Sequence, residues 1–527
     1  MAIESTPPVV RPDTLPRVRL EAVAERAEAW CDPADAATVV TGIALSTQSV
    51  QPGDLFVALP GKNGHGAQYA AQAVQAGAAA VLTDAAGEAE ARSAGVPCII
   101  SDNLRDRLGE LSAFIYDTAD SDLVIFGITG TNGKTTTAHV LEAVLGQMGL
   151  VTGLSTTAER HIAGEVFVSK LTTPEATDVH ALLARMKEQS VQAVVLEVSA
   201  QGLTHGRVDG IVFDCAGFTN LSIDHLDDYG TMENYFQAKE ILFRPERART
   251  GVVSMETPWG LRLLSEPTIP VSSISADADA DPDWRLEILE SLPQSTRFRV
   301  QNRAGDRVET TVALLGDHLV ADAGLAIAMI VEAGYPAAQV QAAVHDGIRV
   351  YIPGRTESVS GPTGPRVYVD FGHSSDAFEK TLRAVRTVTP GRVIMLFGAD
   401  GDRDPVKRPE MARVAAAGSD IVVVTDHHPR FEDPASIRRM LVDAAREAFP
   451  GKQIVEVSPP EAAIDYAVDL ARDGDAILWA GPGHQDYRDI RGVRTPYSAR
   501  ELAREALTRH GWPAQQPSEP AVPSREL

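Results

Sequence analysis

The sequence predicts an α/β protein of three domains. Its 527 residues suggest about three domains, at roughly 100 to 200 residues per domain. Short β-branched runs alternate with alanine-rich helical stretches, which is the βαβ rhythm of a parallel sheet covered by helices. A strand-like run at 123–128 also leads directly into a glycine-rich turn and a helix, the order found in phosphate-binding loops.

Composition and charge disfavour several classes of protein. The chain carries 48 Lys and Arg against 72 Asp and Glu, a net charge of −24, which disfavours binding to nucleic acid or to an anionic membrane. The cysteines, Cys31, Cys98 and Cys215, are far apart and indicate neither a disulfide framework nor a zinc site. The start of the chain lacks the pattern of a signal peptide, and no apolar run approaches the roughly 18 residues of a membrane span. We therefore expect a cytoplasmic protein without membrane insertion.

Changes in composition divide the chain into segments. The polar stretch YDTADSD precedes the run at 123–128, and a Gly-, Pro- and Ser-rich stretch covers 353–365. We expect a flexible N-terminal segment at 1–24, domains at 25–118, 119–352 and 353–510, and a flexible tail at 511–527. In the third domain, strand-like runs at 366–371, 392–397, 420–425 and 475–480 alternate with helical stretches, which predicts a Rossmann-like sheet.

The glycine-rich turn has the composition of a phosphate loop. Gly130 and Gly133 allow close approach of backbone amides to phosphate oxygens, Lys134 adds a positive charge, and Thr135 can ligate Mg²⁺. The spacing departs from GxxxxGK[ST], because Ile128 stands where the first glycine belongs, and this disfavours an ordinary motor or kinase. A ligand-free turn is the alternative, but Lys-Thr-Thr follows the turn directly. The segment therefore predicts ATP or GTP binding.

Several ordered motifs resemble those of a known family. The stretch GTNGKTT is followed by Thr172-Thr173-Pro174, by Glu197-Val198-Ser199 and by NLSIDHLD at 220–227, which together resemble the Mur ligases. Within that family, four further stretches resemble the tripeptide synthetase (MurE) type: PGDLFVALPG, MENYFQAKEILF, PGRTE and GDRDPVKRPEM. The resemblance covers about 40–505 and implies an N-terminal acceptor domain, a central P-loop ATPase domain and a Rossmann-like C-terminal domain that binds an amino acid.

The resemblance implies ATP-dependent amide bond formation through an acyl phosphate in peptidoglycan precursor synthesis. The expected partners are small molecules only: ATP, an acid acceptor, by resemblance UDP-N-acetylmuramoyl-L-alanyl-D-glutamate, and an amino acid. A monomer is expected. The residues that match the family's catalytic positions are Lys134, Glu197, His225, Lys239, Arg355 and Asp370.

By resemblance, two Mg²⁺ ions are expected. Thr135 and Glu197 would bind one, and His225 and Lys239 would serve the second. The family's matching lysine is carbamylated by CO₂, which converts a cation into the anionic oxygen ligand that Mg²⁺ prefers. Without the resemblance, each residue has an ordinary alternative: an ion pair for Lys239 or Arg355, a helix cap for Glu197 and a hydrogen-bonded loop position for His225.

The remaining matching positions form three sets. ATP is expected to contact Gly130, Thr131, Asn132, Gly133, Lys134, Thr135, Thr136, Asp322, Arg355, Asp370 and His373. The acceptor is expected to contact Thr47, Thr172, Thr173, Ser199 and Arg207. The amino acid is expected to contact Arg403, His427, His428, Arg430, Gly481 and Gln485.

The chain departs from the family where it recognises substrates. Ser46-Thr47-Gln48 replaces Asp-Ser-Arg, and Ser199-Ala200-Gln201 replaces Ser-Ser-His. Leu319 and Asp322 replace two asparagines of the segment that faces adenine. Binding of the acceptor and of the base is therefore expected to differ from the family pattern.

The largest departure concerns the amino acid. His427-His428-Pro429-Arg430 replaces Asp-Asn-Pro-Arg, and GPGHQ replaces GKGHE at 481–485, so that neutral Gln485 stands in place of a carboxylate. Loss of a charge-assisted bond to a distal ammonium is worth roughly 1.5 to 3 kcal/mol, which disfavours diaminopimelate. Arg403 and Arg430 still suit a carboxylate. We expect the adjacent histidines to point in opposite directions and to form hydrogen bonds instead of a metal site.

Three functional hypotheses follow. The first is the cell-wall ligase, and the second is a diverged ligase with a different acid and amine in specialised metabolism or envelope tailoring. The third, a non-catalytic nucleotide-binding scaffold, predicts damage to the phosphoryl-transfer residues. Because those residues are all present, an active ligase is favoured.

Overall fold

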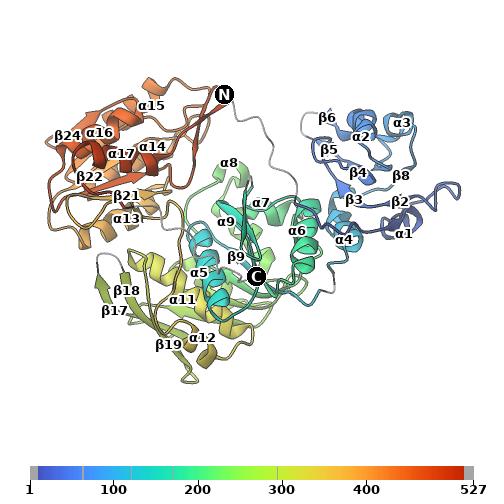
Figure 1. The fold of residues 1–527 in the computed structure, drawn as a ribbon, viewed down its shortest axis with the longest axis horizontal. Helices are drawn as coiled ribbons and strands as arrows, with labels where there is room; N and C mark the ends of the chain where they lie inside the picture. Colours follow the sequence, from blue (N-terminus) through green and yellow to red (C-terminus); the bar gives the residue numbers. More distant parts are fainter. Residues whose placement is uncertain (1–9, 62–63, 120, 170, 293–294, 516–527) are drawn as a thin grey trace, which may run out of the picture.

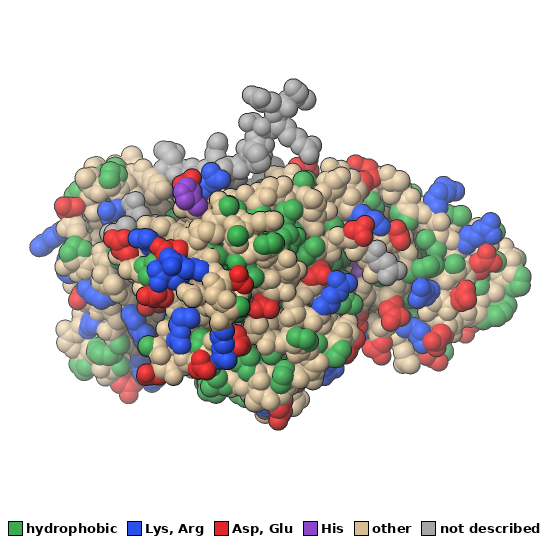
Figure 2. All heavy atoms as spheres, turned by 90° about the horizontal axis from the view of Figure 1, so that it is seen from below, with side chains coloured by type: hydrophobic (Ala, Val, Ile, Leu, Met, Phe, Trp, Pro, Cys, Tyr) green, Lys and Arg blue, Asp and Glu red, His purple; other side chains and the backbone are tan. Residues whose placement is uncertain are grey.

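The structure, a computed structural model, shows three α/β domains (Figure 1) and describes residues 10–61, 64–119, 121–169, 171–292 and 295–515. On the face shown in Figure 2, acidic and basic side chains are interspersed, so the net charge of −24 does not gather into one patch there. Within the described ranges, no helix is both long and apolar enough to cross a membrane. The three cysteines are free.

The N-terminal domain has a parallel sheet with strand order β3-β4-β7-β8. Each strand is short and largely apolar, and its buried side chains pack against helices. The strands are β3 (Gly42–Ala44), β4 (Asp54–Ala58), β7 (Ala80–Thr83) and β8 (Cys98–Ile100), and the helices are α1 (Leu20–Arg26), α2 (Ala70–Gln75), α3 (Glu88–Ser93) and α4 (Leu104–Tyr116).

The prediction of a flexible segment at 1–24 is wrong from residue 10 onward; residues 1–9 lie outside the described ranges. Strand β1 (Val18–Arg19) pairs with β2 (Val39–Val40), and Leu20 is fully buried. Arg11 donates two 2.8 Å hydrogen bonds to the buried carboxylate of Asp54. Contacts with β2 and with Asp54 thus offset the entropy lost when residues 10–24 become ordered, and the composition of the segment does not reveal these contacts.

The central domain is built on a mixed sheet. Its strand order is β12-β11-β10-β13-β9-β14-β15-β16-β17-β18-β19, with parallel pairing from β10 to β17 and antiparallel pairing at both ends. The strands are β9 (Val124–Thr129), β10 (Thr152–Ser155), β11 (Glu159–Ile162), β12 (Glu165–Val168), β13 (Ala193–Glu197), β14 (Phe213–Phe218), β15 (Ala248–Ser254), β16 (Val271–Ser275), β17 (Trp284–Leu292), β18 (Ser295–Asn302) and β19 (Arg307–Val312).

Two hydrophobic cores cover the faces of this sheet. Phe126 and Ile128 of β9 pack with α5 (Lys134–Gln147) and α11 (Asp317–Glu332), whereas Ile125 faces the core that contains α6 (Ala176–Glu188). This alternation follows the two-residue period of a strand. The other helices are α7 (Ala200–Thr204), α8 (Leu226–Tyr229), α9 (Met232–Glu240), α10 (Pro258–Ser265) and α12 (Ala337–Ala343).

The C-terminal domain has the predicted Rossmann-like sheet. Its strand order is β20-β21-β25-β22-β23-β24, parallel except for β20. The strands are β20 (Glu357–Ser358), β21 (Arg366–Asp370), β22 (Val393–Phe397), β23 (Ile421–Val424), β24 (Gln453–Glu456) and β25 (Ala476–Ala480). The helices are α13 (Ser375–Thr387), α14 (Lys407–Gly418), α15 (Pro434–Ala448), α16 (Pro460–Leu470) and α17 (Ala499–Arg509), and β26 (Tyr487–Ile490) forms a hairpin with β27 (Val493–Pro496).

The predicted flexible tail at 511–527 begins with ordered chain. Ala514 forms an antiparallel bridge to Ser360, and Trp512 packs against Gly364. The prediction is therefore wrong for 511–515, because these residues pack on the sheet edge; 516–527 lie outside the described ranges.

Candidate active site

The phosphate loop connects the end of β9 to α5. Gly130 and Gly133 have positive φ angles of 147° and 87°. A Cβ atom at Gly130 would lie 1.9 Å from Thr219 Oγ1, and one at Gly133 would lie 2.2 Å from Asp322 Oδ1. The loop therefore requires glycine at both positions.

Residues that follow β14 brace this loop. Thr131 N–H donates to the Asn220 carbonyl at 2.9 Å, and Asn132 N–H donates to Asn220 Oδ1 at 3.0 Å. Thr219 Oγ1 donates to the Asn132 carbonyl at 2.6 Å. Thr136, in the first turn of α5, is buried. These bonds fix the backbone conformation that phosphate binding needs.

Two lysines share one carbonyl of the loop. Lys134 Nζ donates to the carbonyls of Gly130 and Thr131 at 3.0 and 2.9 Å, and Lys239 Nζ donates to the Gly130 carbonyl at 2.7 Å. Lys239 is 1% exposed. Burial, together with the neighbouring charge of Lys134, holds the pKa of Lys239 well below its ordinary value. The expected alternative, an ion pair of Lys239 with Glu233 or Glu240, does not form.

Glu197 ends β13, the strand that pairs with β9. Its Oε2 accepts hydrogen bonds from Thr157 N–H at 3.0 Å and from Thr157 Oγ1 at 2.7 Å. Its Oε1 is buried and has no hydrogen-bond partner among the described residues. The helix-capping alternative is wrong, because Ser199 Oγ caps α7. A buried carboxylate oxygen without a partner beside a phosphate loop suits a cation.

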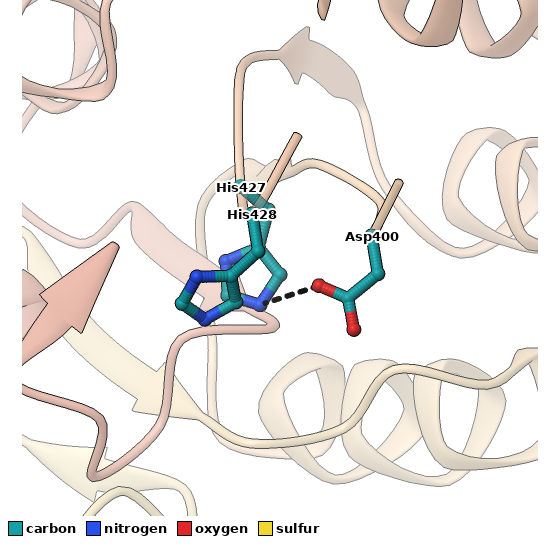
Figure 3. Close-up of side chains that lie close together, drawn as sticks. All are labelled: Asp400, His427 and His428. Carbon is teal, nitrogen blue, oxygen red and sulfur yellow. Dashed lines mark ion pairs between the residues drawn. The ribbon is translucent and has the colours of Figure 1, made fainter. Parts of the chain in front are cut away.

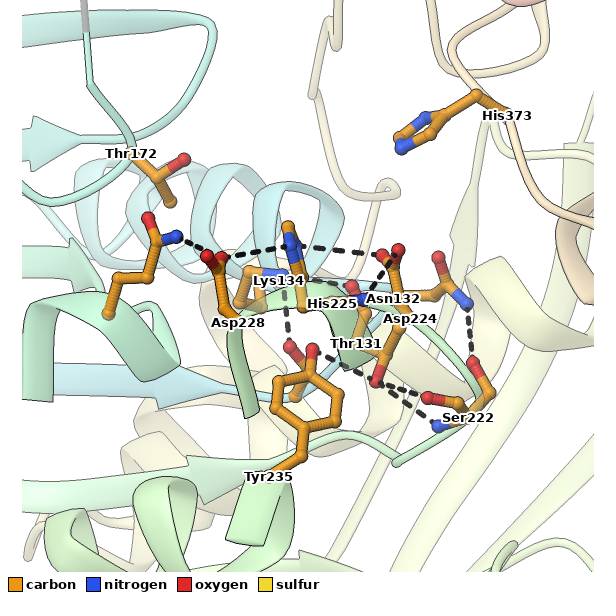
Figure 4. A network of polar contacts seen from close by, with 12 residues as sticks. Thr131, Asn132, Lys134, Thr172, Ser222, Asp224, His225, Asp228, Tyr235 and His373 are labelled. Atoms are coloured by element: carbon orange, nitrogen blue, oxygen red, sulfur yellow. Dashed lines mark hydrogen bonds and ion pairs between the residues drawn. The ribbon is translucent and has the colours of Figure 1, made fainter. Parts of the chain in front are cut away.

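His225 precedes α8 in a left-handed conformation with φ 52° (Figure 4). Its side chain is half exposed and pairs with Asp224 at 3.7 Å. The Tyr235 ring lies near both predicted partners of the second metal: its centroid is 6.0 Å from the His225 ring centroid and 4.6 Å from Lys239 Nζ. The structure thus places His225 and Lys239 around one aromatic ring.

Four of the predicted acceptor residues lie together beside Glu197. Thr173 Oγ1 donates to the Glu197 carbonyl at 3.0 Å and accepts from Ser199 N–H at 2.9 Å. Arg207 Nη1 donates to the Thr173 carbonyl at 3.2 Å, and Thr172 Oγ1 lies within hydrogen-bond distance of Thr157 Oγ1, at 2.9 Å. Thr47 lies apart from them, in the turn after β3 of the N-terminal domain.

Arg355 and Asp370 connect the C-terminal domain to the phosphate loop. Arg355 Nη2 donates to Thr135 Oγ1 at 3.0 Å, and its guanidinium group lies over the Phe371 ring at 4.7 Å. Asp370 accepts from Thr356 N–H at 2.8 Å and from Gly372 N–H at 2.7 Å. Arg355 forms no ion pair within the described chain, so that alternative is wrong. Asp370 thus fixes the backbone next to Arg355, through Thr356, and next to Phe371, through Gly372.

Other residues of the C-terminal domain also face the central domain. Asn132 Nδ2 donates to Asp376 Oδ2 at 3.1 Å. Burial acts to raise the pKa of Asp224, but the charges of His225, His373 and Lys407 bring it below its ordinary value. His373, whose ring packs edge-on against Phe371, therefore faces the central domain, as Figure 4 shows.

A cavity of about 30 Å³ lies beside the loop, between α11 and α13. Its lining includes Asn132, Gly133, Glu256, Asp322 and Lys380. Burial raises the pKa of Asp322 well above its ordinary value and also raises the pKa of Glu256. The two substituted asparagine positions therefore differ in environment: Asp322 lines the cavity, whereas Leu319 is buried in the hydrophobic core.

The predicted amino-acid residues converge on the loops that follow β22, β23 and β25. His428 Nδ1 accepts from Asp489 N–H at 3.0 Å, and its Nε2 lies 2.7 Å from Gln485 Oε1. Gly481 N–H donates to the Asp370 carbonyl at 2.9 Å. Arg430 Nη2 lies 3.7 Å from Asp400 Oδ2.

The prediction that His427 and His428 point in opposite directions is wrong. Their ring centroids are 4.2 Å apart (Figure 3). Strand β23 ends at Val424, so the alternation of a strand no longer applies at these positions. The predicted hydrogen bonding is confirmed for His428.

Arg403 is exposed, and it forms no hydrogen bond or ion pair with the rest of the described chain. The structure also adds residues that the sequence did not indicate: Thr157, Phe371, Asp376 and Asp400. Asp400 follows β22 by three residues, and the position of a polar residue just beyond a strand was the available signal. The others come together only through the packing of separate elements.

Three family models match the chain: "Mur ligase family, catalytic domain" at 39–116, "Mur ligase middle domain" at 128–330 and "Mur ligase, glutamate ligase domain" at 354–483. A UDP-N-acetylmuramyl-tripeptide synthetase of Leifsonia xyli subsp. xyli is 52% identical, over 90% of this chain and 92% of its own length. A UDP-N-acetylmuramoyl-L-alanyl-D-glutamate–2,6-diaminopimelate ligase of Streptomyces coelicolor is 43% identical, over 90% and 93%.

Solved structures agree. The structure of a UDP-N-acetylmuramoyl-L-alanyl-D-glutamate–2,6-diaminopimelate ligase matches with a TM-score of 0.65 at 25% identity, over 94% of this chain and 99% of that one. MurF from Acinetobacter baumannii has the same fold, with a TM-score of 0.66 at 17% identity, over 94% and 99%. The predicted three-domain fold and the predicted class, an ATP-dependent, ADP-forming ligase of peptidoglycan precursor synthesis, are confirmed. The chain belongs to the Mur ligase family, in its tripeptide synthetase (MurE) branch.

Proposed function

We propose that this chain adds an amino acid to UDP-N-acetylmuramoyl-L-alanyl-D-glutamate in an ATP-dependent reaction. One observation carries the proposal: the phosphate loop, the partner-free oxygen of Glu197 and the group of Thr172, Thr173, Ser199 and Arg207 meet at the carboxyl ends of the adjacent strands β9 and β13. A nucleotide on the loop and an acid beside Thr173 would therefore lie close together. The printed names of the relatives supply the identity of the acceptor.

The chain's own residues can position the first step, attack of the acceptor carboxylate on the γ-phosphate. Lys134 now donates to two loop carbonyls, and these bonds can be exchanged for bonds to phosphate oxygens. Arg355 lies at the same loop through Thr135 and can stabilise charge on the phosphoryl group in transfer. Thr173 and Arg207 can orient the acceptor, so that two anions react in a fixed geometry.

The second step is attack of an amine on the acyl phosphate, which forms the amide and releases phosphate. The amino acid would enter from the loops that follow β22, β23 and β25, because Arg430, His428 and Gln485 line that region. The C-terminal domain already touches the phosphate loop through Arg355 and Asp376, so it can cover the intermediate and exclude water.

The residues present suit Mg²⁺. Glu197 Oε1 is a buried oxygen that finds no hydrogen-bond partner in the described part of the chain, and Thr135 Oγ1 lies at the start of the helix that follows the loop. When bound there, Mg²⁺ would neutralise charge on the phosphates. As an ammonium group, Lys239 cannot ligate a cation.

We also propose that Lys239 is carbamylated. Its burial and the charge of Lys134 favour the neutral amine, which is the form that reacts with CO₂. Intact-protein mass spectrometry at neutral pH in bicarbonate should show an added 44 Da that is absent in Lys239→Ala. An unchanged mass would contradict this modification without affecting the ligase assignment.

The function is tested by phosphate release from ATP with Mg²⁺, the UDP-linked dipeptide acceptor and one amino acid at a time. Turnover that needs both the acceptor and one amino acid establishes the reaction. Turnover with another carboxylic acid, and none with this acceptor, would instead favour the diverged ligase. That alternative is supported by the neutral Ser46-Thr47-Gln48 stretch in the N-terminal domain. We further expect a monomer, which light scattering can test.

A further inference from the structure

Asp400 places a carboxylate in the amino-acid region, where it faces His427 (Figure 3). Its Oδ1 is inaccessible to solvent and accepts no hydrogen bond within the described chain. The nearest cationic or ring nitrogens are His427 Nε2, 3.6 Å from Oδ1, and Arg430 Nη2, 3.7 Å from Oδ2. Both distances exceed those of ordinary hydrogen bonds. The charge of Asp400 is thus only partly compensated.

His427 faces this carboxylate and also lacks a hydrogen bond. Its side chain is 8% exposed, and neither ring nitrogen forms a hydrogen bond with any other described residue. Burial lowers the pKa of His427 to about 3, so the ring is neutral at physiological pH and offers one acceptor nitrogen. For Asp400, burial acts to raise the pKa, but the groups around it, Arg430 among them, bring it below its ordinary value. An anionic and a neutral acceptor therefore face the same space.

The neighbouring residues show which ligand suits this pair. A metal ion would need a third ligand, but His428 accepts from Asp489 N–H at one ring nitrogen and lies 2.7 Å from Gln485 Oε1 at the other. The Arg430 guanidinium group beside Asp400 repels a cation in proportion to its charge, so it disfavours a divalent ion more than a singly charged one. An ammonium group carries one charge and three donors, which suits a carboxylate and a neutral imidazole.

We propose that Asp400 and His427 bind the side-chain ammonium group of the incoming amino acid, so that the enzyme selects amino acids with a distal amine. This inference rests on the proposed function and names the class of its amine substrate. Gln485 leaves its own position neutral, and Asp400 supplies the negative charge from the neighbouring loop. Asp400 is then the residue that determines specificity.

The test compares amino acids that differ only in the distal amine. Lysine is paired with norleucine, diaminopimelate with 2-aminopimelate, and 2,4-diaminobutyrate with 2-aminobutyrate. For each, kcat/KM is measured by phosphate release with the wild type and with Asp400→Asn. In the wild type, the preferred amino acid should exceed its analogue by about ten- to a hundredfold, the value of one charge-assisted bond. Asp400→Asn should abolish most of this preference, chiefly through KM. The control is Glu410→Gln, which removes an exposed carboxylate that pairs with Arg413 on α14.

Each outcome decides a separate question. No turnover with any amino acid and the acceptor would refute the proposed function. If the wild type turns over an amino acid and its amine-free analogue equally well, the ammonium site at Asp400 is refuted and the proposed function stands. If the wild type prefers the amine but Asp400→Asn keeps that preference, the role of Asp400 is likewise refuted. The wild-type comparison needs no variant, so it stands even if Asp400→Asn does not fold. Stoichiometric Zn²⁺ binding that is lost in Asp400→Asn would overturn the ammonium site in favour of a metal site.

Discussion

The substitution Lys134→Ala tests the phosphate loop most directly. The change removes the ammonium group that we expect to contact the phosphates, while the loop keeps its glycines and its bonds to Asn220. Truncating one partner of a buried, hydrogen-bonded charge pair costs about 2 to 5 kcal/mol. At about 1.36 kcal/mol per tenfold change, kcat/KM for ATP should fall roughly 30- to 5,000-fold.

The same substitution should change stability little. Lys134 gives up bonds to the carbonyls of Gly130 and Thr131, but Gly130 keeps its bond from Lys239. The lost bonds are offset in part because burial disfavours the charged lysine, which lowers its pKa. A net change within about 1 kcal/mol would shift the melting temperature by no more than about 4 °C.

ADP release and thermal unfolding measure the two quantities on one preparation. The control is Lys187→Ala, which removes an exposed lysine that pairs with Asp117 and should leave both quantities nearly unchanged. ADP formation by Lys134→Ala at the rate of the wild type would refute the assignment of the loop. A large loss of stability in Lys134→Ala would show that the bond from Lys239 to the Gly130 carbonyl does not hold the loop in place.

Three further substitutions test other parts of the molecule. Glu197→Gln should raise the Mg²⁺ concentration needed for half-maximal activity about tenfold or more, because it removes the negative charge of the carboxylate that contains Oε1. A Mg²⁺ titration with an unchanged midpoint would contradict the role of Glu197 as a metal ligand. Arg207→Ala should raise KM for the acceptor about tenfold and leave KM for ATP unchanged, because Arg207 donates to the carbonyl of Thr173. Steady-state kinetics with each substrate varied in turn measure both constants, and a rise in KM for ATP alone would contradict this role. Arg11→Ala should destabilise the N-terminal domain by about 3 to 5 kcal/mol, because it leaves Asp54 buried without its counter-ion. An unchanged midpoint of urea unfolding would contradict this stabilising role of the Arg11–Asp54 ion pair.

The sequence predicts those parts of the fold that local patterns determine. The apolar run before Gly130 forms β9 at Val124–Thr129, and the predicted helix after it forms α5 at Lys134–Gln147. The four predicted strands of the C-terminal domain appear within a residue or two of their expected bounds. In each case a continuous buried strand is bounded by glycine or polar residues, so neighbouring residues alone carry the information.

Tertiary contacts explain where sequence reasoning fails. Residues 10–17 contain proline and arginine and resemble a solvated segment, yet Arg11 is buried against Asp54, 43 positions away. Thr157 contacts Glu197 only because β10 lies next to β13 in the sheet, and no local pattern reveals that order. The prediction for His427 and His428 fails for a different reason: β23 ends at Val424, so the alternation of side chains along a strand does not extend to these residues.

The departures from the family pattern separate two parts of the site. Around the phosphate loop, the matched side chains Lys134, Thr135 and Arg355 contact one another or the loop, and Glu197 ends the neighbouring strand β13. Around the amino acid, His428 and Gln485 have become partners of each other, which removes both from charge recognition. A pocket that lost its carboxylate without compensation would bind a cationic side chain poorly, but Asp400 restores a negative charge one loop away. The chemistry of the family is thus compatible with a rebuilt amine pocket, because the acyl phosphate forms before the amine has to be recognised.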